Sequence, residues 1–281
     1  MLEVLDNIPV LTSQDMHHKP FNEIINHIYL DDVMNVLKAL PDQSIDLVYG
    51  DPDYNVGIKY NKKSYTVKFD QYIDWYIELC KESMRVLKDN GNLFMINYPK
   101  QNNYLAVKYL YEAAHDVHDY VWVYNTNVGH SPKKFTNAHR SILHATKSKH
   151  NRFYKENVAE PYKNPNDKRI QRNVLNGSNG RMPYSWFYYN LVKNVSKQKT
   201  IHACQIPQGL SEKLILSGTQ PEDTVLVLFG GSGSEIDVCM NTRRNFVSAE
   251  LDETYYRLVN KRIADRRIPE EYKLNFSNEH Q

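Results

Sequence analysis

Residues 224–235 read TVLVLFGGSGSE, and this stretch decides the fold. Residues 224–229 are apolar enough for a buried strand, three glycines follow at 230, 231 and 233, and an apolar pattern then resumes as a helix. A strand, a glycine turn and a helix in this order bring backbone close to a nucleotide-like ligand. Glu250 ends the next predicted strand about 20 residues further on, where a carboxylate accepts both hydroxyls of a ribose. A tight turn followed by a surface acid is the alternative that this stretch alone leaves open.

A second motif, Asp51-Pro52-Asp53-Tyr54-Asn55, follows the short apolar run 45–49. The run predicts a buried strand, and open α/β sheets bind their ligands at the carboxyl ends of such strands. The Asp51 carboxylate and the Pro52 carbonyl are acceptors suited to the hydrogens of an exocyclic amino group, while Tyr54 offers a ring face to an extruded base. By itself, the motif also fits a proline turn that closes a strand.

Outward from these motifs, predicted strands and helices alternate along the chain. Strands are expected over 45–49, 93–96, 120–124, 225–229 and 246–249, and helices over 71–88, 104–114, 209–216, after 233 and over 252–266. This alternation is typical of a parallel sheet covered by helices. A length of 281 residues is enough for one α/β core with a small additional lobe.

Basic residues concentrate in one part of the chain. Residues 120–200 hold 15 Lys or Arg and only three acids, a balance of +12 within a chain of net charge +2, so the remainder carries −10. The apolar periodicity weakens between about 125 and 200 as well. We therefore expect a basic lobe at 126–200 that faces a polyanion, inserted between two parts of a catalytic body at 1–125 and 201–281.

Cysteine content and hydropathy favour a reducing compartment. Cys80, Cys204 and Cys239 are odd in number and lack the spacing of metal ligands, so we expect no zinc site and a cytoplasmic protein. No apolar run approaches the roughly 20 residues that a membrane span needs, and no membrane partner is expected.

The two motifs and their order resemble those of the amino DNA methyltransferases of the permuted β group, which include bacterial and phage enzymes of restriction-modification or orphan type. The signature of that family is Asp-Pro-Pro-Tyr in the N-terminal half and Phe-x-Gly-x-Gly in the C-terminal half. Here the variant DPDY at 51–54 precedes FGGSG at 229–233. The resemblance extends through 29–54, 75–94 and the segment HACQIP at 202–207, which together cover nearly the whole catalytic body.

The resemblance implies a Rossmann-like α/β sheet that binds S-adenosylmethionine and carries an inserted target-recognition lobe. Asp51, Pro52 and Tyr54 would be the catalytic residues that hold the target amino group, and Glu250 would bind the ribose of the cofactor. The other residues implied at the cofactor are Asp32, His202, Gln205, Pro207, Phe229, Gly231, Ser232 and Gly233. For His202, a helix cap or a packed polar group is the alternative.

Two positions depart from the family pattern. Val227 stands where many relatives carry an acid, so the methionine ammonium would rely on another carboxylate. Asp53 replaces the second proline, which relaxes the backbone and adds a charge near the reacting groups. Asp53 is therefore a tolerated variation, an engineered change, an acid that compensates for Val227, or the mark of reduced activity.

The basic lobe supplies the residues that we expect at nucleic acid. Lysines and arginines there would contact phosphates, and Arg181 is also able to read base edges. The candidates are Lys133, Lys134, Arg140, Lys147, Lys149, Arg152 and Arg181. A solvated lysine-rich face is the alternative, and we interpret the aromatic residues at 184–189 as packing the lobe onto the body.

Residues and resemblance together predict transfer of a methyl group from S-adenosylmethionine to an exocyclic amino group of double-stranded DNA, by base flipping and direct in-line transfer. Adenine N6 is favoured over cytosine N4, because an Asp heads the motif more often in adenine-specific members of the family. The alternatives are a catalytically weakened DNA-binding or partner subunit and a methyltransferase of RNA or protein. Further expected partners are a cognate restriction endonuclease system or a second copy of the chain in a homodimer. The expected location is the cytoplasm, either at the nucleoid of a bacterium or in a phage-infected cell.

Overall fold

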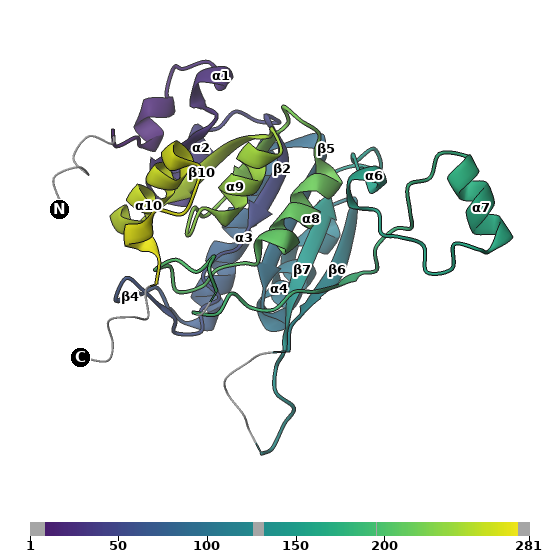
Figure 1. Ribbon diagram of the computed structural model, residues 1–281. Helices are drawn as coiled ribbons and strands as arrows, with labels where there is room; N and C mark the ends of the chain where they lie inside the picture. Colours follow the sequence, from purple (N-terminus) through teal and green to yellow (C-terminus); the bar gives the residue numbers. More distant parts are fainter. Residues whose placement is uncertain (1–8, 126–131, 195, 275–281) are drawn as a thin grey trace.

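A single eight-stranded sheet forms the centre of the computed structural model, which describes residues 9–125, 132–194 and 196–274 (Figure 1). In spatial order the strands are β1 (His27–Leu30), β10 (Asn245–Glu250), β9 (Thr224–Val227), β2 (Ile45–Gly50), β5 (Leu87–Asn97), β7 (His139–Thr146), β6 (Asp116–Val123) and β8 (Trp186–Tyr188). A small antiparallel hairpin pairs β3 (Lys59–Tyr60) with β4 (Lys63–Ser64).

The strand directions confirm the predicted α/β class and add one exception to the parallel sheet. β7 pairs antiparallel with both β5 and β6, whereas every other pairing in the described sheet is parallel. The spatial order also differs from the chain order, because β9 and β10 lie between β1 and β2. Strands from the two ends of the chain therefore form the middle of one sheet.

Helices cover both faces of the sheet. The longer ones are α2 (Val33–Ala39), α3 (Phe69–Val86), α4 (Pro99–Leu105), α7 (Lys168–Leu175), α8 (Gln208–Gly218), α9 (Ser234–Asn241) and α10 (Glu253–Asp265). Shorter turns of helix are η1 (Ser13–Met16), α1 (Phe21–Ile24), η2 (Ala106–Leu110), α5 (Tyr111–Ala113), α6 (Lys155–Val158) and η3 (Glu270–Tyr272). Within the described residues, every helix lacks the length or the apolar character needed to cross a membrane.

Two apolar clusters, one on each face, make the core. Along β2, Val48 joins the cluster formed with α2, α3 and α4, while Leu47 and Tyr49 join the cluster formed with α8, α9 and α10. This alternation follows from the two-residue period of a strand. Because β2 is buried on both faces, its sequence is a continuous apolar run, broken only by Asp46.

The first residues of β5 differ from the prediction. The pattern predicted a helix over 71–88 and then a strand over 93–96, but α3 ends at Val86 and β5 begins directly at Leu87. The extra residues are accommodated as a register shift against β2 between Ile45 and Leu47. Gly91 is needed there because a Cβ atom would lie 2.7 Å from the Asp46 carbonyl oxygen.

The boundaries of the inserted lobe also need correction, because 126–200 is not a separate body. β7 and β8 belong to this segment, and both are strands of the central sheet. Of the aromatic residues at 184–189, which were expected to pack the lobe onto the body, Phe187 is buried and Tyr189 packs against the same core cluster, while Trp186 and Tyr188 are half exposed. What leaves the sheet is the connection from 147 to 185, from which α7 projects into solvent (Figure 1).

Charged side chains tie this connection to the amino-terminal edge of the sheet. Asp46 is buried and accepts hydrogen bonds from Lys88 (2.8 Å), from the Thr224 N–H (2.9 Å) and from Arg152. Arg152 also pairs with Asp223 at 3.2 Å. The connection is therefore anchored to β2, β5 and the start of β9 through one carboxylate.

Replacement of Asp46 by Ala is expected to lower the free energy of unfolding by about 3–5 kcal/mol, because Lys88 and Arg152 lose a buried counter-ion. The matched control is Glu78→Ala, which removes the exposed ion pair with Lys81 and should cost no more than about 1 kcal/mol. Urea unfolding followed by circular dichroism measures both. Equal, small losses in the two variants would show that Asp46 does not anchor the connection.

Candidate active site

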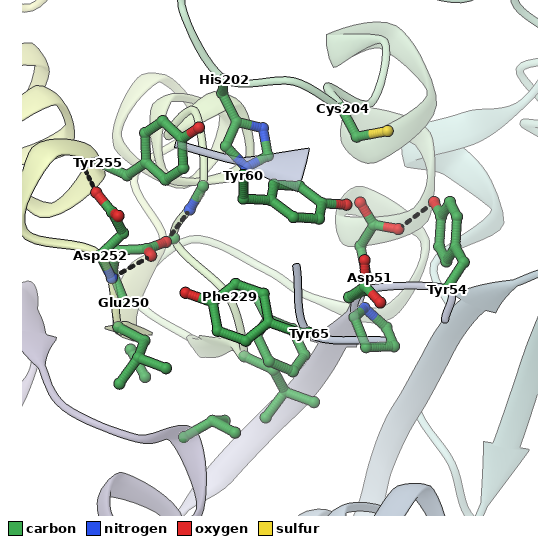
Figure 2. A pocket seen from close by; sticks show the side chains of 18 of the residues that line it. Asp51, Tyr54, Tyr60, Tyr65, His202, Cys204, Phe229, Glu250, Asp252 and Tyr255 are labelled. Carbon is green, nitrogen blue, oxygen red and sulfur yellow. Dashed lines mark hydrogen bonds between the residues drawn. The ribbon is translucent and has the colours of Figure 1, made fainter. Parts of the chain in front are cut away.

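One cavity at the carboxyl-terminal edge of the sheet is lined by both sequence motifs. Its volume is about 460 Å³, and its wall includes Asp51, Tyr54, Gly231 and Glu250. The two motifs meet because β2 and β9 are neighbours, and the Leu228 N–H continues their pairing by donating to the Tyr49 carbonyl at 3.0 Å. Figure 2 shows Asp51 and Tyr54 on one side of the cavity and Glu250 and Asp252 on the other. The sequence predicted each motif, and the fold makes them one site.

The glycine turn after β9 adopts a conformation that other residues rarely reach. Gly231 and Gly233 have φ angles of 51° and 75°, in the left-handed region. Gly233 closes the turn by donating its N–H to the Gly230 carbonyl at 2.8 Å, and it precedes the first turn of α9. Ser232 is buried, and its carbonyl accepts a hydrogen bond from Arg262 at 2.6 Å. Arg262 thus holds the turn on the side away from the cavity, and the other side of the turn lines the cavity.

The Glu250 carboxylate is held at the end of β10 by backbone donors. One oxygen accepts the Gly231 N–H at 2.8 Å, and the other accepts the Asp252 N–H at 2.9 Å. Burial raises the pKa of Glu250 to about 6. Each oxygen keeps a lone pair toward the cavity, which is the requirement for a bidentate acceptor of two vicinal hydroxyls.

Asp51 is a half-buried residue, and Tyr54 sets the orientation of its carboxyl group. The Tyr54 hydroxyl donates to Asp51, and the Tyr54 carbonyl in turn accepts from Gln101 at 2.7 Å. Burial raises the pKa of Asp51 to about 7, against the effect of the Tyr54 hydrogen bond. Tyr54 itself is 3% exposed and packs edge-on against Tyr98, so its ring does not present the open face that the motif suggested. Its evident contact is with Asp51.

Hydrogen bonds replace the missing second proline at Asp53. The side chain accepts the N–H of Asn55 at 2.8 Å, and Asn55 has a φ angle of 58°. The Asp53 carbonyl accepts the Tyr72 hydroxyl at 2.6 Å, and Tyr72 is held by Asn97 at 2.8 Å. The second carboxylate oxygen of Asp53 is buried and has no partner within the described residues. The turn is therefore rigid without proline.

The segment 199–207 forms the wall opposite the glycine turn. His202 lies between Tyr60 and Tyr255, and burial lowers its pKa to about 4, so it is neutral near pH 7. Gln205 holds its own segment by donating to the Gln198 carbonyl at 2.8 Å. Pro207 lies outside the cavity, at the start of α8. Among the buried side-chain nitrogen and oxygen atoms of 199–207, His202 Nδ1 is the one without a hydrogen-bond partner.

Asp32 and Phe229 line the cavity from the β1 and β9 sides. Asp32 also caps α2 by accepting the Met34 N–H at 2.8 Å. Phe229 lies near Trp75 of α3, with ring centroids 6.4 Å apart. The wall between Asp51 on one side of the cavity and Glu250 and Asp252 on the other is therefore apolar (Figure 2).

Several residues of the cavity were not predicted. Glu235 is buried and accepts hydrogen bonds from Ser211 at 2.9 Å and Ser234 at 2.8 Å. Its position two residues after the last glycine was a usable signal, because the first turn of α9 faces the same ligand as the glycine turn. Other lining residues that were not predicted as site residues include Tyr60, Tyr65, Asp252 and Tyr255, for which no local pattern gave a signal, and Trp75 and Cys204, which lie inside segments that carry the resemblance.

Four of the cations expected at DNA lie elsewhere. Arg140 is 7% exposed and lies behind Tyr54, and Arg152 is bound to Asp46 at the opposite edge of the sheet. Lys147 donates to the Leu87 carbonyl at 2.9 Å, and Arg181 pairs with Glu160 at 2.5 Å. These four cations are therefore buried or bonded to other groups of the protein itself. Lys133, Lys134 and Lys149 are exposed.

Solved structures with this fold are DNA methyltransferases. The chain matches the structure titled PvuII DNA methyltransferase (cytosine-N4-specific) with a TM-score of 0.62, at 18% identity over 85% of this chain and 89% of the other. It matches the M1.HpyAVI–SAM complex with a TM-score of 0.57, at 22% identity over 84% of this chain and 98% of the other. The fold is that of S-adenosylmethionine-dependent methyltransferases.

The chain belongs to the DNA methylase family, whose sequence pattern matches residues 45–261. It is 30% identical over 244 residues to the type II methyltransferase M.BglII of Bacillus subtilis, covering 82% of this chain and 67% of the relative. It is 25% identical to the DNA adenine methyltransferase YhdJ of Escherichia coli (strain K12), covering 83% of this chain and 80% of the relative. Its cofactor is S-adenosylmethionine.

The residues of the cavity fit this cofactor. Asp51, Glu235 and Glu250 are buried or nearly so, and none of them takes part in an ion pair within the described residues. Buried carboxylates without cationic partners favour a ligand that brings positive charge. S-adenosylmethionine carries a sulfonium and an ammonium group. The apolar wall at Phe229 and Trp75 suits its adenine ring.

Proposed function

We propose that this protein methylates the N6 amino group of adenine in double-stranded DNA. The observation that carries the proposal is that Asp51, the glycine turn and Glu250 line one and the same cavity. The DPDY motif and its position before FGGSG support membership of the permuted β group. Adenine is preferred over cytosine because Asp heads the motif, and the E. coli relative carries an adenine-specific name.

The cofactor is proposed to lie along the glycine turn. S-adenosylmethionine supplies an electrophilic methyl group on its sulfonium. Glu250 accepts the ribose hydroxyls, while Asp32 and Phe229 border the adenine. Gly231, Ser232 and Gly233 shape the backbone beneath the methionine end, and His202, Gln205 and Pro207 form or support the facing wall.

Glu235 is the proposed acceptor of the methionine ammonium. Val227 cannot serve, because its side chain is buried in the core cluster under α8 and α9. Asp53 accepts the Asn55 N–H with one carboxylate oxygen, while its other oxygen has no partner within the described residues, so Asp53 is the alternative that the test below includes. Glu235 lines the cavity beside the glycine turn, at the start of α9, and the side chains that donate to it within the described residues are the hydroxyls of Ser211 and Ser234. We therefore assign the compensating role to Glu235 rather than to Asp53.

The target base is proposed to enter from the side of Asp51. The Asp51 carboxylate and the Pro52 carbonyl are placed to accept the two hydrogens of the amino group, which turns the nitrogen lone pair toward the cofactor. Asp51 also accepts the proton that this nitrogen gives up when it gains a methyl group, a role suited to a carboxyl with a pKa of about 7. Reaching the cavity requires a base outside the duplex stack.

DNA is proposed to approach the loop that precedes β7. β7 is antiparallel to β5, with Ser141 paired to Asn97, so its first residues lie at the same edge as the cavity. The loop carries Lys133 and Lys134, and Phe135 is 98% exposed beside them. An exposed aromatic ring beside two lysines is suited to contact with phosphates and bases. Lys149 follows β7 and lies at the opposite edge.

Incubation with labelled S-adenosylmethionine and unmethylated genomic DNA, followed by digestion to nucleosides, is expected to yield N6-methyldeoxyadenosine. N4-methyldeoxycytidine as the sole product would reassign the base, and absence of label in DNA would overturn the function.

Asp51→Ala should abolish the product with cofactor affinity retained. Glu250→Ala should instead weaken cofactor binding by about 10- to 100-fold, measured by calorimetry, because two hydrogen bonds to a charged group are lost.

Glu235→Gln is expected to lower the affinity for S-adenosylmethionine by about tenfold or more, since a charge-assisted hydrogen bond to the ammonium is lost. The affinity for methylthioadenosine, which lacks the amino acid end, should stay unchanged. Calorimetric titration with the two ligands separates the outcomes. Equal weakening of both would assign Glu235 a purely structural role, and Asp53→Asn tested in parallel shows whether Asp53 holds the ammonium instead.

Substitution of Lys133 and Lys134 by Ala is expected to weaken DNA binding equally for all sequences and to reduce the slope of log affinity against log salt by about 1.8, or 0.9 per phosphate contact. Lys149→Ala is the control for charge loss at the other edge and should leave the slope unchanged. Fluorescence anisotropy at several salt concentrations measures both. A changed sequence preference would make the two lysines base readers rather than phosphate contacts.

A further inference from the structure

Arg140 occupies an unusual place for an arginine, buried behind the target side of the cavity. It lies on β7, and its guanidinium carbon is 3.7 Å from the ring centroid of Tyr98, 5.2 Å from that of Tyr54 and 5.3 Å from that of Tyr124. One terminal nitrogen donates to the Tyr124 hydroxyl and to the His139 carbonyl. The guanidinium is therefore enclosed by three tyrosines.

This buried cation has no carboxylate in contact. Within the described residues Arg140 forms no ion pair, and its Nε–H has no hydrogen-bond partner. An uncompensated buried ion costs several kcal/mol, whereas a cation–π contact returns about 2 kcal/mol when desolvated. Packing alone would be served better by an apolar side chain of similar size. The charge itself is what needs an explanation.

Tyr54 connects this charge to the reaction centre. One face of its ring lies toward Arg140, and its hydroxyl donates to Asp51. A cation over a phenol ring polarises the hydroxyl and strengthens the hydrogen bond that it donates. Asp51 also experiences the positive field of Arg140 directly, since that field opposes the rise in pKa caused by burial.

We propose that Arg140 is a positioning residue for the methyl transfer: through Tyr54 it keeps the Asp51 carboxylate ionised and aimed at the target amino group. This inference rests on the proposed function, because it assigns Arg140 a task only if Asp51 engages the target. It differs from the phosphate contact that the sequence suggested, because Arg140 lies inside the protein.

The charge balance around Asp51 defines the expected direction. The titratable groups that face it are Tyr49 on β2, Asp53 and Tyr54 in the motif, Tyr60 on β3, Tyr72 and Tyr76 on α3, Cys204, Glu235 on α9 and Arg140 on β7. Arg140 is the one cation among them. Burial, Glu235 and Asp53 raise the pKa of Asp51, while Tyr54 and Arg140 lower it. Loss of the Arg140 charge therefore raises the pKa of Asp51 and reduces its ionised fraction near neutral pH.

The test measures single-turnover methylation from pH 5.5 to 9 for the full chain with saturating S-adenosylmethionine. Arg140→Met should move the acidic limb of the rate profile up by about one pH unit, so that the rate falls about fivefold near pH 7 and about tenfold at pH 5.5, and recovers at pH 9. Arg140→Lys retains the charge and should keep the limb near its original position. Tyr54→Phe breaks the connection and should shift the limb in the same direction as Arg140→Met.

Controls separate this role from a structural one. Arg181→Met removes an arginine that also stacks on a tyrosine, at 4.4 Å from Tyr184, and should leave the profile unchanged. A rate loss of equal size at every pH in Arg140→Met, with weaker cofactor binding or a lower melting temperature, would overturn the proposal. If Arg140→Met does not fold, an unshifted limb in Tyr54→Phe overturns it instead. Failure of the unsubstituted protein to methylate DNA at any pH would refute the proposed function, an outcome distinct from these.

Discussion

The parallel pairing of β9 with β2 is the constraint on which the other features depend. It joins residues 178 positions apart in the chain, as in the hydrogen bond from the Thr224 N–H to Asp46. At the other end of the same two strands, the Leu228 N–H donates to the Tyr49 carbonyl, which places the glycine turn next to Asp51. The two motifs therefore line one cavity because two strands from distant parts of the chain share a register.

The two edges of the sheet treat buried charge in opposite ways. At the amino-terminal edge, Asp46 is fully compensated by Lys88 and Arg152, and these contacts anchor the long connection after β7. At the carboxyl-terminal edge, Glu235 is buried and Asp51 is half-buried, and within the described part of the chain neither has a cation in contact. The ion pairs at the first edge stabilise the fold, whereas the carboxylates without a cation at the second edge create a negative potential that favours binding of a cationic cofactor.

The target motif shows how a rigid turn can be built without its usual second proline. Proline limits the backbone covalently, while here the Asn55 N–H, the Tyr72 hydroxyl and the Gln101 amide hold the same few residues by hydrogen bonds. These donors come from the motif itself, from α3 and from α4. With Asp at position 53, these hydrogen bonds hold the turn beside Asp51, and the sequence alone could not show this.

Features that depend on residues close together in the chain could be predicted from the sequence. Apolar runs and glycine turns are short-range signals, so the α/β class, the strands β2 and β9, the glycine turn and Glu250 at the end of β10 were all predicted, and the resemblance predicted the cofactor. The strand order, the place of β7 in the sheet and the bonds of Arg140, Arg152 and Arg181 were not. Their partners are distant in the chain, and a count of basic residues does not tell which charges are buried. Only the tertiary structure showed that Arg140 is buried and that Lys147, Arg152 and Arg181 bond to other groups of the protein, because ion pairs and hydrogen bonds depend on contacts that the sequence does not contain.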